Sequence, residues 1–199
     1  MTVLAPAAGF TDPVQQSQQA FRVLLDAMAR PGRVVSLEQE PGHPAGLAPA
    51  LAAALLTLCD LDTPVWLGPG FNTVEMRDWL RFHTGAPLAS AANLAAVALL
   101  SAEQGITLED FSFGTDEAPE RGATLLIQVP ALNGAPAATW RGPGIKDAVA
   151  MPACGLTPAF WHQRVLLGSA FPRGLDIYLA CGGDIVGLPR STAITIEGA

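Results

Sequence analysis

The sequence predicts a single α/β domain built as a three-layer helix–sheet–helix sandwich around a mixed sheet. Helix-like and strand-like segments alternate along the chain, which is typical of this fold class. The segment TLLIQVP (124–130) is a continuous apolar run of strand length, as expected for a central strand that is buried on both faces. Near the C-terminus, two apolar segments flank Gly182-Gly183. This pattern predicts a hairpin, and therefore antiparallel strands at one edge of the sheet.

The first helix is predicted to begin at Asp12 and Pro13. Aspartate caps free amides, and proline suits the first helical position because no hydrogen-bonded amide is lost there. Pro31-Gly32 ends the helix, and RVVSL (33–37) follows as a strand. The early QQSQQ run is either a solvated face or a face that contacts a partner. A helical spacing of apolar residues predicts a buried stripe of Phe21, Leu24, Leu25 and Met28.

Two further helices and a short strand are predicted in the middle of the chain. Residues 47–58 are apolar nearly all round, so this helix should be buried on more than one side. PVWL (64–67) predicts a strand. Asn72 with Glu75 three positions later resembles a capping box. The helix that starts there is expected to end near Gly85.

From residue 88 onwards, the sequence predicts a mixture of short helices and strands. Residues 88–101 fit either a helix or a buried strand, and 107–113 predict a short helix. ATWR (138–141) predicts a strand. A helix should open at Thr157-Pro158, and TAITIE (192–197) should close the chain as a last strand. No repeat or linker divides these segments, so residues 1–199 are predicted to form one domain.

Composition excludes several classes of function. The net charge of −7 argues against nonspecific nucleic-acid binding, because that binding requires a basic face. Charged residues make up only 15% of the chain, which suggests that another subunit covers part of the surface. The three cysteines have neither metal nor redox spacing and are expected to be reduced.

The chain is expected to be soluble and cytoplasmic. Its start lacks the basic segment and the long apolar core of a signal peptide. The longest uncharged apolar stretch, 47–59, has 13 residues and contains Pro49, whereas a membrane span needs roughly 20 residues.

Standard catalytic and metal-binding motifs are absent from the sequence. The three histidines are far apart, and no helix carries the paired histidines of zinc enzymes. LGSAF is not a nucleophile elbow, and neither GPGFNT nor GPGIKD completes a dinucleotide fingerprint. Pyridoxal phosphate requires a lysine for its Schiff base, and Lys146 is the only lysine. We therefore expect no metal and no cofactor.

Anion recognition is the chemistry that the sequence leaves open. Arginine forks suit phosphate and carboxylate groups, and glycine turns let backbone amides approach an anion. The alternatives are structural: a helix-end arginine interacts with the helix dipole, and GPGI reverses the chain after a strand. For GPGI we favour the turn. Asp176 could face an arginine across the sheet. The candidate anion-binding residues are Arg81, His83, Arg141, Gly142, Gly144 and Arg190.

An ordered set of segments resembles one bacterial family, PhnH, a subunit of the carbon–phosphorus lyase system for phosphonate use. The resemblance spans about residues 10–197. The matching segments are DPV-x-x-x-Q-x-x-FR-x-LL-x-AM-x-x-PG (12–32), DTPVWL (62–67), LRFHTGAPL (80–88), GATLLIQV (122–129), GPGI (142–145), FPRGLDIYL (171–179) and GLPRST (187–192).

This resemblance implies a fold, partners and a role. PhnH proteins resemble the large domain of pyridoxal-phosphate-dependent transferases but are not known to carry the cofactor. They form homodimers and join PhnG, PhnI and PhnJ in an assembly that converts phosphonate plus ATP to a ribose 1-phosphonate triphosphate. The leading hypothesis is an accessory, noncatalytic subunit. The alternatives are a chain that supplies phosphate-binding residues to a composite site, and a pyridoxal enzyme that uses Lys146.

Overall fold

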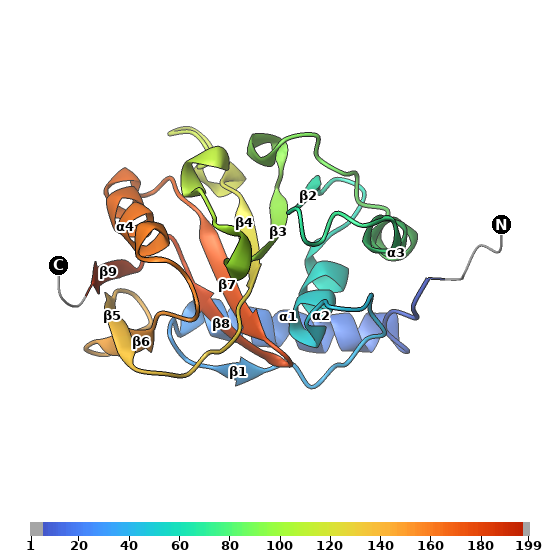
Figure 1. Cartoon of the computed structure of the whole chain (residues 1–199), viewed down its shortest axis with the longest axis horizontal. Helices are drawn as coiled ribbons and strands as arrows, with labels where there is room; N and C mark the ends of the chain where they lie inside the picture. The colour runs from blue at the N-terminus through green and yellow to red at the C-terminus, as the bar shows by residue number, and fades with distance from the viewer. Residues whose placement is uncertain (1–5, 197–199) are drawn as a thin grey trace.

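The computed structural model describes residues 6–196 as an α/β fold around a six-stranded mixed sheet (Figure 1). The strand order is β1-β8-β7-β4-β3-β2. The predicted central strand is β4, and its three middle side chains are completely buried. The strands of this main sheet are β1 (Val35–Ser36), β2 (Val65–Leu67), β3 (Val97–Ser101), β4 (Thr124–Gln128), β7 (Asp176–Cys181) and β8 (Asp184–Leu188).

Strand direction divides the main sheet into two parts. β2, β3, β4 and β7 run parallel to one another. β7 and β8 pair as an antiparallel hairpin, with Ala180 opposite Ile185, and β1 adds antiparallel to β8. The sequence prediction of a mixed sheet with antiparallel strands at one edge is therefore confirmed.

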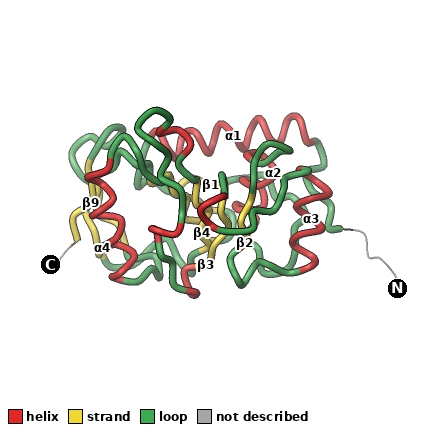
Figure 2. Tube along the Cα trace, turned by 90° about the horizontal axis from the view of Figure 1, so that it is seen from above, coloured by secondary structure: helices red, strands yellow, loops and turns green. Residues whose placement is uncertain are grey.

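The two faces of the main sheet are covered differently, and this corrects the predicted helix–sheet–helix sandwich. Three helices cover one face and pack against side chains such as Leu99, Leu126 and Tyr178. They are α1 (Pro13–Ala29), α2 (Pro49–Leu58) and α3 (Val74–Thr84). Figure 2 shows α1 lying along one side of the strands. A second core on the opposite face contains Leu125, Ile127 and side chains from one helix and a small sheet.

A three-stranded antiparallel sheet, with a single α-helix beside it, takes the place of the predicted second helical layer. It consists of β6 (Val149–Pro152), β5 (Pro136–Arg141) and β9 (Ala193–Ile196), in that order. The predicted strands ATWR and TAITIE therefore exist, but they lie outside the main sheet. Residue 197 of TAITIE is outside the described residues. Helix α4 (Pro158–Leu167) packs beside β9. Trp161 of α4 and Trp140 of β5 contact each other in the core on this side of the main sheet.

Helix α1 packs through half of the predicted stripe, since Leu24 is buried and Met28 packs against the core, and otherwise through small residues. Phe21 and Leu25 are 45% and 53% exposed, whereas the buried positions are Ala20, Leu24 and Ala27. The physical reason is close approach. A Cβ atom on Gly187 of β8 would lie 2.5 Å from the carbonyl oxygen of Ala27. The helix can therefore sit on the sheet only where both surfaces carry small side chains.

Two further sequence predictions need correction, and one open alternative is decided. The cap of α3 is Thr73, whose hydroxyl accepts a hydrogen bond from the Met76 amide, and not Asn72. The ambiguous stretch 88–101 ends in a buried strand, β3. The short helix predicted over 107–113 is reduced to one 3-10 turn at Leu108–Asp110.

Across residues 6–196, none of the helices combines the length and hydrophobicity needed to span a bilayer.

The close contact between α1 and β8 generates a stability prediction. We expect Gly187→Ala to lower the free energy of unfolding by about 1–3 kcal/mol, because overpacking forces backbone shifts. Each kcal/mol corresponds to roughly 2–4 °C in melting temperature for a chain of this size. Gly168→Ala is the matched control, since Gly168 has a helical φ of −58° and a Cβ added there would meet no atom within 4 Å. Equal melting temperatures for the two variants would contradict this account of the packing.

Candidate functional site

The two sheets are joined by residues 189–192, which we call the sheet link. Arg190 in this link makes two side-chain contacts with Asp176, the first residue of β7. Nη2 lies 2.7 Å and Nε lies 3.1 Å from Oδ2. The Arg190 amide donates to Oδ1 of the same carboxylate at 2.9 Å. The prediction that Asp176 faces an arginine is thus confirmed.

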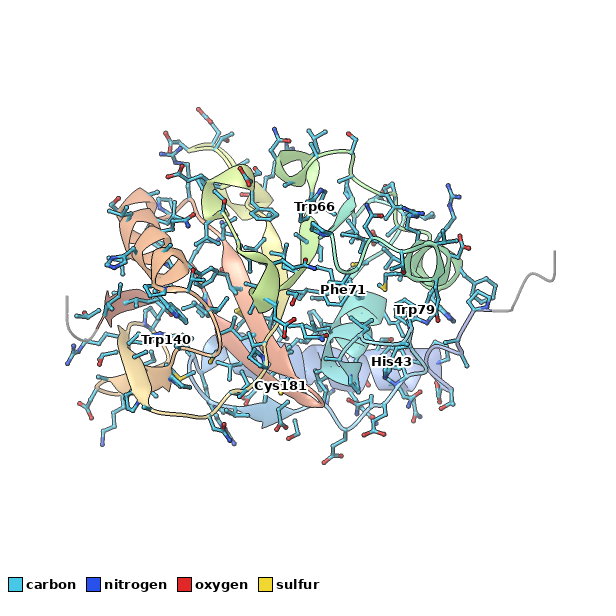
Figure 3. All side chains as sticks on the ribbon, in the orientation of Figure 1. His43, Trp66, Phe71, Trp79, Trp140 and Cys181 are labelled. Atoms are coloured by element: carbon cyan, nitrogen blue, oxygen red, sulfur yellow. The ribbon has the colours of Figure 1, made fainter. Side chains whose placement is uncertain are left out.

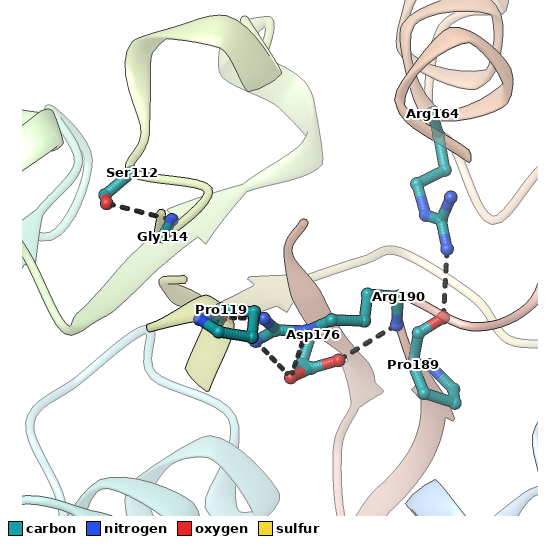
Figure 4. Close-up of polar contacts among 7 residues, drawn as sticks. All are labelled: Ser112, Gly114, Pro119, Arg164, Asp176, Pro189 and Arg190. Atoms are coloured by element: carbon teal, nitrogen blue, oxygen red, sulfur yellow. Dashed lines mark hydrogen bonds and ion pairs between the residues drawn. The ribbon is translucent and has the colours of Figure 1, made fainter. Parts of the chain in front are cut away.

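The same arginine also reaches the segment that precedes β4. Its Nη1 donates to the carbonyl oxygen of Pro119 (Figure 4). The side chains of Arg190 and Asp176 are only 14% and 29% exposed, so solvent screens this pair less than a surface pair. Arg190 therefore holds the sheet link, β7 and the 119 region together, and its charge is balanced by Asp176.

A second arginine, Arg164 of α4, holds the other side of the sheet link. Its Nη2 donates to the carbonyl oxygen of Pro189 at 2.9 Å (Figure 4) and to that of Thr192 at 3.1 Å. The residue is 2% exposed. Burial lowers the pKa of the Arg164 guanidinium to about 10, against an opposing effect of the Asp176 charge. Arg164 remains a cation at neutral pH but has only carbonyl oxygens as described partners.

A hollow of about 220 Å³ opens beside the sheet link. Arg164 and Thr192, both buried, lie in its wall, and Arg190 and Ser191 line the same space. Its remaining lining is small or apolar: Val165, Gly168, Phe171, Ala193 and Ile194. None of its lining residues is acidic, so the hollow has a positive lining and an apolar border.

The GPGI segment is a turn, as the sequence analysis favoured. The Ile145 amide donates to the Gly142 carbonyl oxygen at 3.1 Å, directly after β5. Gly142 lies against the backbone of Ser191 and Thr192 in the sheet link. Gly144 has a φ of +83°, and any Cβ there would overlap the carbonyl oxygen of Ala29 at the end of α1. The glycines therefore serve chain reversal and close packing.

The candidates on α3 have different surroundings. The Nε2 atom of His83 lies 2.8 Å from the carbonyl oxygen of Ala7, and its ring packs closely against Gly9. His83 therefore positions the N-terminal segment. Arg81 is exposed and lines a hollow of about 510 Å³ together with Arg77 and the acidic Asp78.

The structure separates five of the six candidate residues into two groups, and the sixth, Gly144, packs against the end of α1. Arg141, Gly142 and Arg190 come together, since β5 pairs with β9 next to the sheet link. Arg81 and His83 lie on α3. In Figure 3, Trp79 of α3 and Trp140 of β5 mark opposite ends of the molecule. One site containing all six residues is therefore not formed, and the group at the sheet link includes a buried arginine, Arg164, that the sequence analysis did not single out.

The carboxyl ends of the parallel strands, where open α/β sheets commonly bind ligands, are largely occupied by the chain itself. The side chain of Gln128, at the end of β4, accepts from the Ala48 amide at 2.8 Å and donates to the Gly46 carbonyl oxygen at 2.9 Å. A hollow of about 450 Å³ nearby is lined by Asp184 and Cys181 and by no cation. This edge therefore does not suit an anionic ligand.

The cysteines are not arranged for nucleophilic or metal chemistry. Burial raises the pKa of Cys59 to about 12 and that of Cys154 to about 11. Both thiols therefore stay protonated at neutral pH, where a thiolate would be the reactive form. Residues 6–196 contain no group of three or more histidine, cysteine or acidic side chains placed to hold a metal ion.

Comparison with known proteins identifies the family. A family profile described as "Bacterial phosphonate metabolism protein (PhnH)" matches residues 8–195. The chain belongs to the PhnH family. The resemblance inferred from the ordered motifs is thereby confirmed.

Two curated relatives of this PhnH-family chain match over nearly their full length. A Rhizobium meliloti (strain 1021) protein named "Alpha-D-ribose 1-methylphosphonate 5-triphosphate synthase subunit PhnH" is 37% identical over 194 residues, which is 96% of each chain. A Stutzerimonas stutzeri protein named "Putative C-P lyase subunit protein HtxG" is 31% identical over 185 residues, which is 92% of this chain and 88% of the relative.

One sequence signal could have identified Arg164. Phe160, Trp161 and Arg164 follow a helical i, i+1, i+4 spacing after the Thr157 cap, and all three are buried on one face of α4. A charged residue in an apolar stripe indicates either a buried charge with partners or a binding group. Its carbonyl partners could not be inferred, because they lie 25 and 28 residues away along the chain.

The GPGI turn yields a prediction about stability. We expect Gly144→Val to lower the free energy of unfolding by about 1–3 kcal/mol more than Gly46→Val, through overpacking against α1. The two positions share a positive φ, +83° in both, but a Cβ added at Gly46 would meet no atom within 4 Å. The difference in the free energy of unfolding between the two variants therefore measures the contact with Ala29 rather than backbone strain.

Thermal melts of the two variants provide the measurement, with phosphate titration of each as a second readout. Similar melting temperatures combined with a selective loss of phosphate binding in Gly144→Val would show that GPGI is a ligand cradle and not a turn.

Proposed function

We propose that this chain is an accessory subunit of a carbon–phosphorus lyase complex. In this role it supports the conversion of phosphonate and ATP to a ribose 1-phosphonate triphosphate during phosphonate catabolism. One observation carries the proposal: the nearly full-length similarity to a protein named as a subunit of α-D-ribose 1-methylphosphonate 5-triphosphate synthase. The second relative, named as a putative subunit of the C-P lyase, supports the same assignment.

We infer that the chain does not break bonds alone. Its buried thiols are protonated, and the two arginines at the sheet link bind the chain itself. The candidate residues separate into two groups instead of converging on one reacting centre. These features favour a subunit that contributes surface and shape over one that performs the chemistry. The free thiols suit the reducing cytoplasm, where we propose that the protein acts.

We propose PhnG, PhnI and PhnJ as the partner subunits, and a homodimer for the isolated chain. The surface offers apolar area for such contacts. Val14, Phe21 and Leu25 follow one another along the outer face of α1 and are 81%, 45% and 53% exposed. We call these three residues the α1 outer stripe. Exposed apolar side chains gathered on one helix face indicate a protein contact, and we assign this face to another subunit of the complex.

The relation to pyridoxal-phosphate-dependent transferases is a proposal about fold only. The parallel strands, followed by an antiparallel edge, support a likeness to the large domain of those enzymes. The lysine chemistry does not fit this chain. Lys146 is exposed on the GPGI turn and lines none of the hollows described above. A Schiff-base lysine needs an enclosing site that orients the cofactor, so the pyridoxal enzyme hypothesis is disfavoured.

A second candidate function has support from the surface of α3. Arg77 and Arg81 line adjoining hollows beside residues 85–90, and Arg77 also donates to the Asn72 side chain at 2.8 Å. These two arginines, of which Arg81 is exposed and Arg77 is half-buried, could contact phosphate groups if a partner subunit completed the site. The chain would then be a contributor to a composite site for a nucleotide or phosphonate.

Assembly provides the test of the proposed function. We expect the tagged chain, expressed together with the other subunits of the system, to recover PhnG, PhnI and PhnJ, as identified by mass spectrometry. Phe21→Ser should reduce this recovery because it places a polar group in the α1 outer stripe. Leu166→Ser is the control, since Leu166 is 71% exposed on α4 at a distance from α1.

The purified chain should show no turnover of ATP with methylphosphonate. Turnover by the chain alone, or failure to recover any of the three subunits, would contradict the accessory role. ATP binding by the isolated protein that is weakened by Arg81→Ala would instead favour the composite site.

A further inference from the structure

We propose that the hollow beside the sheet link is a binding site for a small tetrahedral oxyanion of the phosphate type. The polar residues that line this site are Arg164, Thr192, Ser191 and Arg190. The inference is independent of membership in a complex, because every residue that it uses belongs to this chain.

The first argument is charge. Two arginines line the hollow, but only one of them has a direct acidic partner. Arg190 is balanced by Asp176. Arg164 donates to two carbonyl oxygens through Nη2 and has no ion pair among residues 6–196. A buried cation without an acidic partner of its own is costly. The carboxylate that acts on Arg164, Asp176, is already paired with Arg190, so an anion in the adjoining hollow would stabilise Arg164.

The second argument is hydrogen bonding. Neither Nε of Arg164 nor Oγ1 of Thr192 has a hydrogen-bond partner within the described part of the chain, although both atoms are buried. The two residues are 2% and 1% exposed and line the same hollow. Buried polar groups in proteins nearly always have partners. Two such groups on residues that line one hollow indicate a ligand with several acceptor oxygens.

The third argument is size and lining. A volume of about 220 Å³ greatly exceeds the roughly 30 Å³ that one water occupies and is sufficient for a phosphate group with a short substituent. A cation, two hydroxyls and no acidic side chain suit an oxyanion with more than two oxygens. Val165 and Phe171 at the rim are apolar and partly exposed, so they can contact an alkyl or ring substituent.

The other hollows lack this combination. The hollow at the carboxyl ends of the parallel strands contains Asp184 and no cation. The hollow at α3 includes Arg77 and Arg81, but Asp78 shares it and none of these three side chains is buried. Only the hollow at the sheet link, of those described, unites a buried unpaired cation with a buried unpaired hydroxyl.

Arg164 also has a structural role as a clamp on the sheet link, so loss of stability in an Arg164 variant would not identify a ligand. The test therefore uses the wild-type protein. The signal of the Arg164 Nε–H group in a nitrogen-15 correlation spectrum, assigned with Arg164→Lys, is followed during titration with sodium phosphate. Sodium chloride at equal ionic strength and sodium acetate are the two comparison titrations.

We expect a saturable shift of the Arg164 signal with phosphate and none with chloride. Thr192→Val keeps the shape of the side chain while removing the hydroxyl, and it should weaken phosphate binding about tenfold, as expected for one hydrogen bond to a charged group. Arg22→Ala is the matched control and should leave binding at this site unchanged, because Arg22 is an exposed cation on α1 that lines none of the hollows described above.

Absence of a saturable phosphate response in the wild-type protein would overturn the proposal. A response to acetate that saturates before the response to phosphate would also overturn it, because the ligand would then be a carboxylate. Equal phosphate affinity in Thr192→Val and wild type would show that the anion binds elsewhere. None of these outcomes affects recovery of the partner subunits, so the site and the proposed function can fail separately.

Discussion

The ion pair between Asp176 and Arg190 is the contact on which the arrangement of the two sheets depends. Asp176 opens β7 in the main sheet, and Arg190 lies in the link that carries the chain to β9 in the small sheet. The same guanidinium reaches Pro119, and Arg164 binds the link from the opposite side. Without these contacts the small sheet would be held to the main sheet chiefly by apolar packing, which does not fix direction.

The small number of charged residues in the chain links this arrangement to the role of a subunit. The chain has 11 basic residues, and two of them, Arg164 and Arg190, are engaged inside the fold. What remains on the surface is poor in charge and includes exposed apolar side chains such as Phe21 and Phe171. A protein built this way suits a place within an assembly. The one positive hollow that we describe at the sheet link is formed by the same arginines that hold the sheets together.

The sequence predicted the main sheet well because its signals are local. A continuous apolar run located β4, and a glycine pair located the β7–β8 hairpin. The ordered motifs identified the family. The placement of ATWR and TAITIE in a second sheet was not predictable, because strand partners are set by contacts across the chain: Thr139 pairs with Thr195 and Ala150. Phe21 and Leu25 of the α1 stripe were misassigned for a similar reason, since the orientation of the helix depends on its close contact with Gly187.

Site residues were harder to predict than strands. The sequence marked Asp176 and Arg190 correctly as polar residues next to buried strands, and the structure pairs them. It also marked His83, which instead binds the N-terminal segment through Ala7. Arg164 was missed because its partners are backbone carbonyl oxygens, which carry no sequence signal. Polar contacts between side chains can be guessed from residue types, but contacts to the backbone require the fold.

A double-mutant cycle between Asp176 and Arg190 tests the central claim most directly. Asp176→Ala, Arg190→Ala and the double variant are unfolded in urea, and the coupling free energy is calculated from the four stabilities. If this ion pair fixes the sheet link, the coupling should be about 1–3 kcal/mol. Additive effects, within roughly 0.5 kcal/mol, would show that the two sheets are held together without it.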